Sequence, residues 1–330
     1  MSTYTDQSLL SREEIEQAFE RVGDVLSQTP TVRSRHYSAK QQRNVFLKLE
    51  NFQPTHSFKV RGATNAILSL PEEERKRGII CASGGNHGLG VAYACAELKL
   101  PCHVFLAKEA PKIKIEAIKQ LGAQATVYEG VFEEANKLAK ATAKQEKKAY
   151  IHPFDDARVM AGQGTIVLEL LKQMERIDSI IVSIGGGGLI SGLVSAVKHF
   201  TPKTKVIGVE TEGTHCLSLS IEAGKIVELD EVKSVAADSL GAPRTEARQF
   251  AIVSKYVDEL IVMNDDDTIE ALLELLREEK ILVEPASSCT LAALNSGKIR
   301  SDLGTNVVAI MCGGNVAVER VCEWLHKAEE

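Results

Sequence analysis

The stretch Ser179-Ile-Ile-Val-Ser-Ile-Gly-Gly-Gly-Gly188 joins an apolar run to four consecutive glycines, and a helical pattern begins at Leu189. Fully apolar runs are typical of parallel strands, and glycines let backbone amides approach an anion closely. The amino end of the next helix adds a partial positive charge. The turn lacks both the GxGxxG spacing of dinucleotide sites and a P-loop lysine, so it predicts a compact phosphate site. The alternative is that the glycines serve only a tight turn.

The order of apolar strand and helix repeats on both sides of this turn. Strands are expected at 45–49, 78–82, 103–106, 125–128, 179–183, 206–209 and 307–311. Helices are expected at 11–26, 89–99, 112–121, 132–144, 162–174, 189–199, 268–279 and 286–294. Short apolar strands separated by helices predict an α/β fold with mostly parallel, twisted sheets covered by helices.

Composition narrows the class of protein. The chain has 330 residues, of which 44% are hydrophobic and 25% charged, enough for two domains of an ordinary globular enzyme. The net charge of −6 is spread along the chain, which argues against nucleic-acid and membrane-surface partners. No apolar run reaches the roughly 18 residues of a membrane span, and no signal-peptide pattern opens the chain, so we expect a cytoplasmic protein. Seven irregularly spaced cysteines without a CxxC pair favour buried thiols over disulfides or zinc.

Two further glycine turns follow predicted strands. They are Ser83-Gly-Gly-Asn-His-Gly88 and Cys312-Gly-Gly-Asn315. The first could bind a carboxylate through backbone N–H groups, or be an ordinary turn with a solvated histidine. Because ligands of parallel α/β sheets bind beyond the carboxyl ends of the strands, the three turns together predict one cleft for a small, polar, phosphorylated ligand.

A lysine motif adds chemistry to this cleft. In Asn51-Phe-Gln-Pro-Thr-His-Ser-Phe-Lys-Val-Arg-Gly-Ala63, Lys59 is flanked by apolar residues; a lysine at such a place is more often solvated. This segment resembles the cofactor-lysine motif of the fold-type-II pyridoxal-phosphate enzymes, the family of tryptophan synthase β, threonine and serine dehydratases, and serine racemase. Collinear resemblances to the same family occur at 83–88, 152–156, 161–165, 185–189, 284–286 and 312–315.

The resemblance implies a tryptophan synthase β-like fold, with a large cofactor-binding domain (1–77 and 151–330), a small substrate-gating domain (78–150) and a homodimer. Lys59 would bind pyridoxal 5'-phosphate as a Schiff base and act as the general base. The implied cofactor-binding residues are Lys59, Phe58, Asn86, Gly185, Gly186, Gly187, Gly188, Leu189, Gly241, Glu284, Cys312 and Gly313. The implied residues for an amino-acid substrate are Ser83, Gly84, Asn86, His87 and Ser239, the last of which could equally be a turn residue.

Three departures from the family pattern point to the reaction. Cys312 stands where most members have Ser or Thr beside the pyridine nitrogen, and a neutral thiol is a weak donor, which favours elimination. It could also be a buried core thiol, or a thiolate facing a protonated ring. Gly84 stands where serine racemase has the second serine that protonates the α-carbon, which disfavours two-base racemisation. Phe154 resembles threonine dehydratases rather than the racemase.

A metal is not expected. Glu210 overlaps a loop where some members bind a divalent cation, but this loop is shorter and lacks the second acidic ligand, so Glu210 is only a weak candidate. Possible contacts for an acidic substrate are Arg158, His215 and Arg244, although each could be an ordinary surface residue.

These observations lead to one expected reaction. We expect a carbon–oxygen lyase of amino-acid catabolism that dehydrates and deaminates L-threonine or L-serine to a 2-oxo acid and ammonia. The alternatives are a serine racemase, a dehydratase of 3-hydroxyaspartate or phenylserine, a β-replacement synthase, and a cofactor-binding protein without activity.

Overall fold

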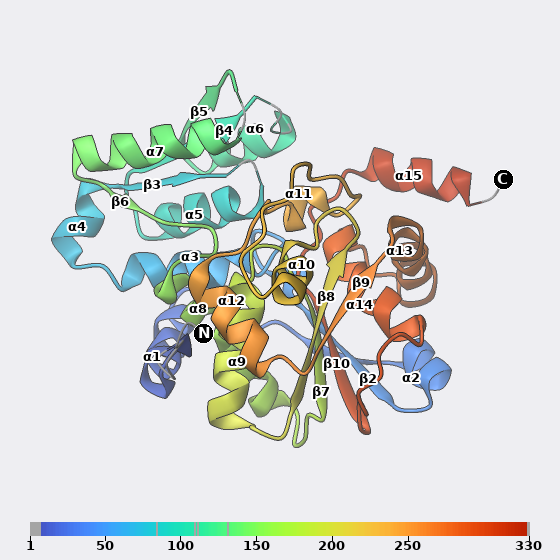
Figure 1. Cartoon of the computed structure of the whole chain (residues 1–330). Helices are drawn as coiled ribbons and strands as arrows, with labels where there is room; N and C mark the ends of the chain where they lie inside the picture. Colours follow the sequence, from blue (N-terminus) through green and yellow to red (C-terminus); the bar gives the residue numbers. More distant parts are fainter. Residues whose placement is uncertain (1–7, 84, 109, 111, 131, 329–330) are drawn as a thin grey trace.

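The chain forms two separate β-sheets in a computed structural model that describes residues 8–328 except 84, 109, 111 and 131 (Figure 1). The six-stranded sheet has the order β1 (Thr31–Ser34), β2 (Asn44–Leu49), β10 (Asn306–Met311), β7 (Ser179–Ser183), β8 (Lys205–Thr211), β9 (Glu259–Met263). The four-stranded sheet has the order β5 (Gln124–Tyr128), β4 (Cys102–Ala107), β3 (Ile79–Ala82), β6 (Ala149–Tyr150). Every pair of neighbours is parallel except β1 and β2. The predicted fold class is confirmed.

Helices connect the strands and cover the sheets (Figure 1). They are α1 (Arg12–Gly23), α2 (Arg35–Gln41), η2 (Glu50–Phe52), α3 (Lys59–Leu68), α4 (Glu72–Arg77), α5 (Asn86–Glu97), α6 (Lys112–Gln120), α7 (Phe132–Glu146), α8 (Ala157–Gln173), α9 (Gly188–Phe200), α10 (Cys216–Ala223), α11 (Ala237–Leu240), α12 (Ala247–Tyr256), α13 (Asp265–Glu279), α14 (Pro285–Asn295) and α15 (Val318–Lys327). Ser11 and Glu14 form a capping box at the start of α1.

The six-stranded sheet brings distant parts of the chain together at one edge. Leu49 at the end of β2 is level with Met311 at the end of β10. On its other side β10 pairs in parallel with β7, in the register Ala309 to Ile181, and β7 ends at Ser183. Since parallel strands all end at the same edge, the segments that follow β2, β10 and β7 emerge side by side. The residues before Lys59, the Cys312 turn and the glycine turn are these three segments.

The four-stranded sheet is packed on both faces. Ile79 and Cys81 of β3 point into one apolar cluster with α5, whereas Ile80 and Ala82 point into another with α7. This alternation follows from the period of two in a strand. Figure 1 shows α5 and α7 on opposite sides of this sheet. Burial on both faces explains why β3 is apolar at all four positions.

Several helices begin earlier in the structure than predicted, and the strands β1, β6 and β9 were not predicted. The helix predicted at 89–99 begins at Asn86, because Gly85 occupies the N-cap position and the first turn includes His87. The helix predicted at 162–174 begins at Ala157, where Asp156 caps the first turn through its side chain. In the part of the chain described, no helix is long and apolar enough to cross a membrane.

Candidate functional site

Lys59, the Ser83 turn and Gly186 of the glycine turn line one cavity of about 370 Å³. Its lining includes Lys59, Ser83, Asn86, His87, Phe154 and Gly186. The four glycines of the 185–188 turn, with Lys59 and Cys312, also line a smaller adjoining hollow. The structure therefore gathers residues from all the predicted turns around one lysine.

Lys59 is the first residue of α3 and is half-buried at the edge of the cavity. Its Nζ donates a hydrogen bond to the carbonyl oxygen of Pro153 at 3.0 Å and lies 5.3 Å from the centre of the Phe58 ring. Burial lowers the pKa of Lys59 to about 8, although the nearby Cys312 and Glu284 act in the opposite direction. A lysine with this pKa has a substantial neutral fraction near neutral pH, as a nucleophile or general base requires.

The glycine turn has no room for side chains. A Cβ on Gly186 would lie 2.7 Å from ring atoms of Phe154, and one on Gly188 would lie 2.7 Å from the Cβ of the same residue. Gly187 adopts a φ of 91°, a left-handed conformation that favours glycine. The turn leads directly into α9, whose free N–H groups and positive helix end favour an anion. These features fit the phosphate of a cofactor.

Asn86 connects the start of α5 with the opposite wall of the site. Its Nδ2 lies 3.1 Å from both carboxylate oxygens of Glu284, and its Oδ1 accepts a hydrogen bond from Asn315 Nδ2 at 2.7 Å. Burial raises the pKa of Glu284 above its usual value. The network bridges the two sheets, since α5 follows β3 and Asn315 follows β10.

Cys312 is a buried thiol directly after β10. Its Sγ lies 3.4 Å from the Oγ of Ser183 and 3.4 Å from the Oγ of Ser287. Burial, and then the charge of Glu284, raise the pKa of Cys312 to about 12. The thiol is therefore neutral near neutral pH, which argues against the thiolate alternative.

The side chains of the Ser83 turn already have partners close by. The Ser83 Oγ accepts the N–H of Gly85 at 3.1 Å. His87 Nε2 lies 3.1 Å from the carbonyl oxygen of Ile151, so Nε2 carries the proton, and burial lowers the pKa of His87 to about 3. A neutral imidazole offers no charge to a carboxylate, which leaves the Ser83 hydroxyl proton and the unused backbone N–H groups of the turn as the available donors. Gly84 lies outside the described residues.

The remaining predicted site residues border the same space. Ser239 in α11 lies 3.5 Å from Asn86 Nδ2, and Gly241 ends the same helix. Leu189 is buried in the first turn of α9. Gly313 forms an antiparallel bridge with Ser57, just before the lysine.

The candidates for a metal or an acidic substrate have other partners. The Glu210 carboxylate accepts the N–H groups of Leu217 and Ser218 at the start of α10, and burial raises its pKa to about 7. Among the described residues, no group of three or more His, Cys, Asp or Glu side chains could hold a metal ion. Arg158 pairs with Asp156 at 2.7 Å. His215 Nδ1 accepts a hydrogen bond from the N–H of Gly213. Arg244, which lines the cavity, pairs with Glu246 at 3.3 Å.

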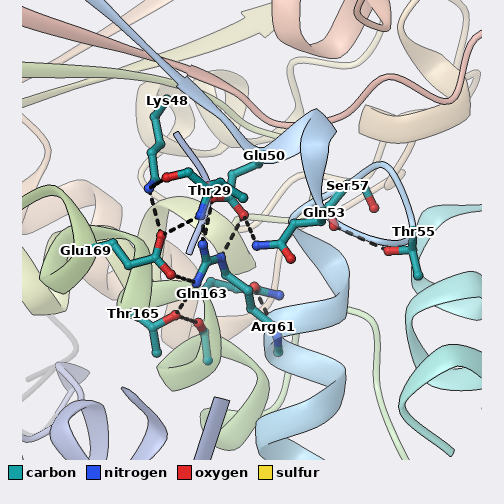
Figure 2. A network of polar contacts seen from close by, with 12 residues as sticks. Thr29, Lys48, Glu50, Gln53, Thr55, Ser57, Arg61, Gln163, Thr165 and Glu169 are labelled. Carbon is teal, nitrogen blue, oxygen red and sulfur yellow. Dashed lines mark hydrogen bonds and ion pairs between the residues drawn. The ribbon is translucent and has the colours of Figure 1, made fainter. Parts of the chain in front are cut away.

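A buried ionic network surrounds Arg61 in the first turn of α3 (Figure 2). Arg61, two residues after Lys59, contacts Glu50 and Glu169 at 2.7 Å each, and Lys48 contacts Glu169 at 2.7 Å. No side chain of these pairs is more than 4% exposed. Burial opposes the charge on Arg61, but the two carboxylates outweigh burial and raise its pKa. The network joins β2, α3 and α8 around the first turn of α3.

Several residues of the site escaped the sequence analysis. Pro153 holds Lys59 through a backbone oxygen, which leaves no trace in residue type. Ser183 and Ser287 adjoin motifs that were recognised, the glycine turn and the Glu284 helix entry, and this proximity was the available signal. Gln249 lies against Gly187 from α12, a helix that the sequence analysis did not assign.

Comparison with known proteins identifies the class. A family described as "Pyridoxal-phosphate dependent enzyme" matches residues 22–313, so the chain belongs to this family, and the predicted cofactor is confirmed. The L-threonine ammonia-lyase of Thermotoga maritima is 36% identical over 320 residues, which are 97% of this chain and 79% of that protein. The catabolic L-threonine dehydratase TdcB of Staphylococcus aureus (strain USA300) is 37% identical over 316 residues, 95% and 91% of the two chains. The structure of maize serine racemase superposes with a TM-score of 0.90 at 31% sequence identity, and the match covers 96% of this chain and 97% of that chain.

Proposed function

We propose that this protein catalyses the pyridoxal-phosphate-dependent dehydration and deamination of L-threonine, L-serine or both to a 2-oxo acid and ammonia. The observation that carries the proposal is Lys59: a half-buried amine with a lowered pKa, beside the glycine turn and a neutral thiol. The similarity to threonine ammonia-lyase and threonine dehydratase supports this reaction and substrate class.

The residues of the cleft would hold the cofactor at both ends. The backbone of 185–188 would bind the phosphate, Lys59 would bind the aldehyde carbon, and Asn86 would donate to the ring oxygen. Phe58, Leu189, Gly241, Glu284 and Gly313 would border the ring. Within this proposal, residues 1–77 and 151–330 form the large cofactor-binding domain, and 78–150 form the small domain that closes over the substrate.

The chain supplies positions and protons for the reaction. When bound, pyridoxal phosphate withdraws electrons from the substrate α-carbon. Lys59 Nζ, freed when the substrate amine takes its place, would take the α-proton, and the carbonyl of Pro153 would orient this amine. The N–H groups of the Ser83 turn bind the substrate carboxylate, and Ser239 contacts the hydroxyl that leaves. The neutral thiol of Cys312 gives no charge to the ring nitrogen, which favours loss of the hydroxyl over reprotonation of the α-carbon.

The lowered pKa of Lys59 predicts how cofactor loading depends on pH. Only a neutral amine attacks the cofactor aldehyde, so the loading rate of the apoprotein is expected to rise with pH and level off above about pH 8. N-acetyl-lysine methylamide, an ordinary exposed amine, should show its midpoint near pH ~10.4. Stopped-flow absorbance measures both rates. A loading midpoint for the protein near that of the free amine would contradict the burial argument.

A screen for released 2-oxo acid tests the proposed reaction. The substrates are serine, threonine, 3-hydroxyaspartate and phenylserine, each as both enantiomers and, where they exist, as threo and erythro forms. We expect the highest kcat/KM with L-threonine or L-serine. If only 3-hydroxyaspartate or phenylserine released a 2-oxo acid, that compound would be the substrate in place of threonine and serine. If none of the compounds did, the proposed lyase activity would be rejected.

Serine racemase is the second candidate, favoured by the similarity to the maize enzyme. Chiral analysis of unreacted L-serine separates the two, because a racemase accumulates D-serine faster than 2-oxo acid. We further propose a catabolic role, a cytoplasmic location and a homodimer. The dimer is tested by light scattering of the holoenzyme.

A further inference from the structure

The Cys312 thiol is enclosed by two serine hydroxyls from different elements. Ser183 ends β7 and Ser287 lies in the first turn of α14, and each Oγ is 3.4 Å from Sγ. All three residues are at most 2% exposed. Because these side chains are shielded from bulk solvent, their protons are shared chiefly with neighbouring atoms of the chain.

The proton of Ser287 is already committed. Its hydroxyl donates to the carbonyl oxygen of Gly313 at 2.8 Å, and its oxygen accepts the N–H of the same residue at 3.0 Å. A hydroxyl has one proton and two lone pairs, so one lone pair on Ser287 Oγ is left. In a hydrogen bond with Cys312 Sγ, Ser287 Oγ can therefore only be the acceptor.

The other serine has the opposite role. Ser183 Oγ–H donates to Sγ, which uses a sulfur lone pair and leaves the thiol proton free to donate elsewhere. Among the described residues two acceptors are in range: Ser287 Oγ at 3.4 Å and Glu284 Oε1 at 3.9 Å. Glu284 is farther away, and its oxygens also accept from Asn86 Nδ2. The nearer acceptor is Ser287.

We propose that Ser287 is a positioning residue that accepts the thiol proton of Cys312, so that the thiol offers no donor to the cofactor ring. This inference rests on the proposed function only in placing the ring nitrogen beside Cys312. A buried pyridine nitrogen without a donor stays unprotonated, because burial disfavours the charged form. The ring is then a weaker electron sink, and elimination is favoured because the departing hydroxyl takes up the electrons.

The S–H stretching band of Cys312 tests the proposal directly in the infrared spectrum of the apoprotein. Subtraction of the Cys312→Ala spectrum isolates this band from those of the other cysteines. We expect a band at the lowered frequency of a hydrogen-bonded thiol. Ser287→Ala should move it to higher frequency, whereas Ser183→Ala, which removes a hydroxyl at the same distance, should leave the thiol proton bonded.

The opposite pattern, a band that moves with Ser183→Ala and not with Ser287→Ala, would overturn the proposal. A free-thiol frequency in the unsubstituted protein would do so even if Ser287→Ala failed to fold. These outcomes involve neither substrate nor turnover, so they are distinct from a failure of the proposed reaction.

A second measurement uses the holoenzyme loaded with cofactor labelled with nitrogen-15 in the ring. We expect the resonance of a pyridine without a hydrogen bond, and an upfield shift in Ser287→Ala, where the released thiol proton can reach the ring. An unshifted resonance in a Ser287→Ala protein that binds the cofactor would contradict the proposed positioning.

Discussion

Replacing Lys59 with alanine is expected to lower kcat for 2-oxo acid release by roughly 10³-fold or more, because one side chain serves as attachment point and general base. The absorbance band of the covalently bound cofactor should be lost as well. Borohydride reduction of the unsubstituted holoenzyme, followed by peptide mass spectrometry, should locate the cofactor on Lys59. The side chain lies against Phe58 and Pro153, and no other predicted site residue carries an amine.

Lys76→Ala is the matched control for this substitution. Lys76 lies on α4 with a side chain that is 59% exposed and paired with Glu72 on the same helix. We expect its loss to leave both the absorbance band and kcat unchanged. Retention of the band and of turnover in Lys59→Ala would reject the assignment of the site.

Of the substitutions considered, Arg61→Met should lower the free energy of unfolding the most. The substitution leaves the carboxylates of Glu50 and Glu169 buried, with only Lys48 to balance them. Removing one partner of a buried ionic group typically costs about 3–5 kcal/mol, since the remaining charge cannot return to water. Urea unfolding of the apoprotein at pH 7, followed by circular dichroism, measures the change without a contribution from bound cofactor.

Two further variants make this result specific. Arg12 forms an exposed ion pair with Glu16 on α1, and Arg12→Met should cost less than about 1 kcal/mol. Adding Glu50→Gln to Arg61→Met removes one uncompensated charge and should restore part of the lost stability. Equal losses for Arg61→Met and Arg12→Met would mean that the network does not bear on folding.

Much of the fold was predictable because the inner strands of its sheets are buried on both faces. β3 is apolar throughout, β7 has three consecutive apolar residues at its centre, and both end at glycine-containing turns, so their positions followed from residue type. The order of strands was not predictable in the same way. β10 lies between β2 and β7 through pairing of residues far apart in the chain, and hydrophobic patterning carries no information about such partners.

Part of the site was likewise predictable from the sequence and part was not. Lys59 and the glycine turn were found because their chemistry requires particular residue types in sequence. Lys48, Glu50, Arg61 and Glu169 escaped notice, because charged residues are usually solvated and nothing in their spacing indicates burial. Their pairing depends on three elements meeting in space, which only the folded chain reveals.

The central position of β10 also bears on how the chain is made. The four-stranded sheet is encoded in one continuous segment and can assemble soon after that segment leaves the ribosome. β2 and β7 must wait for β10, and at synthesis rates of about 5–20 residues per second the wait for β2 lasts roughly tens of seconds. During that time each exposes an unpaired apolar edge that invites aggregation. The nascent large sheet is therefore the part of this protein most dependent on chaperones.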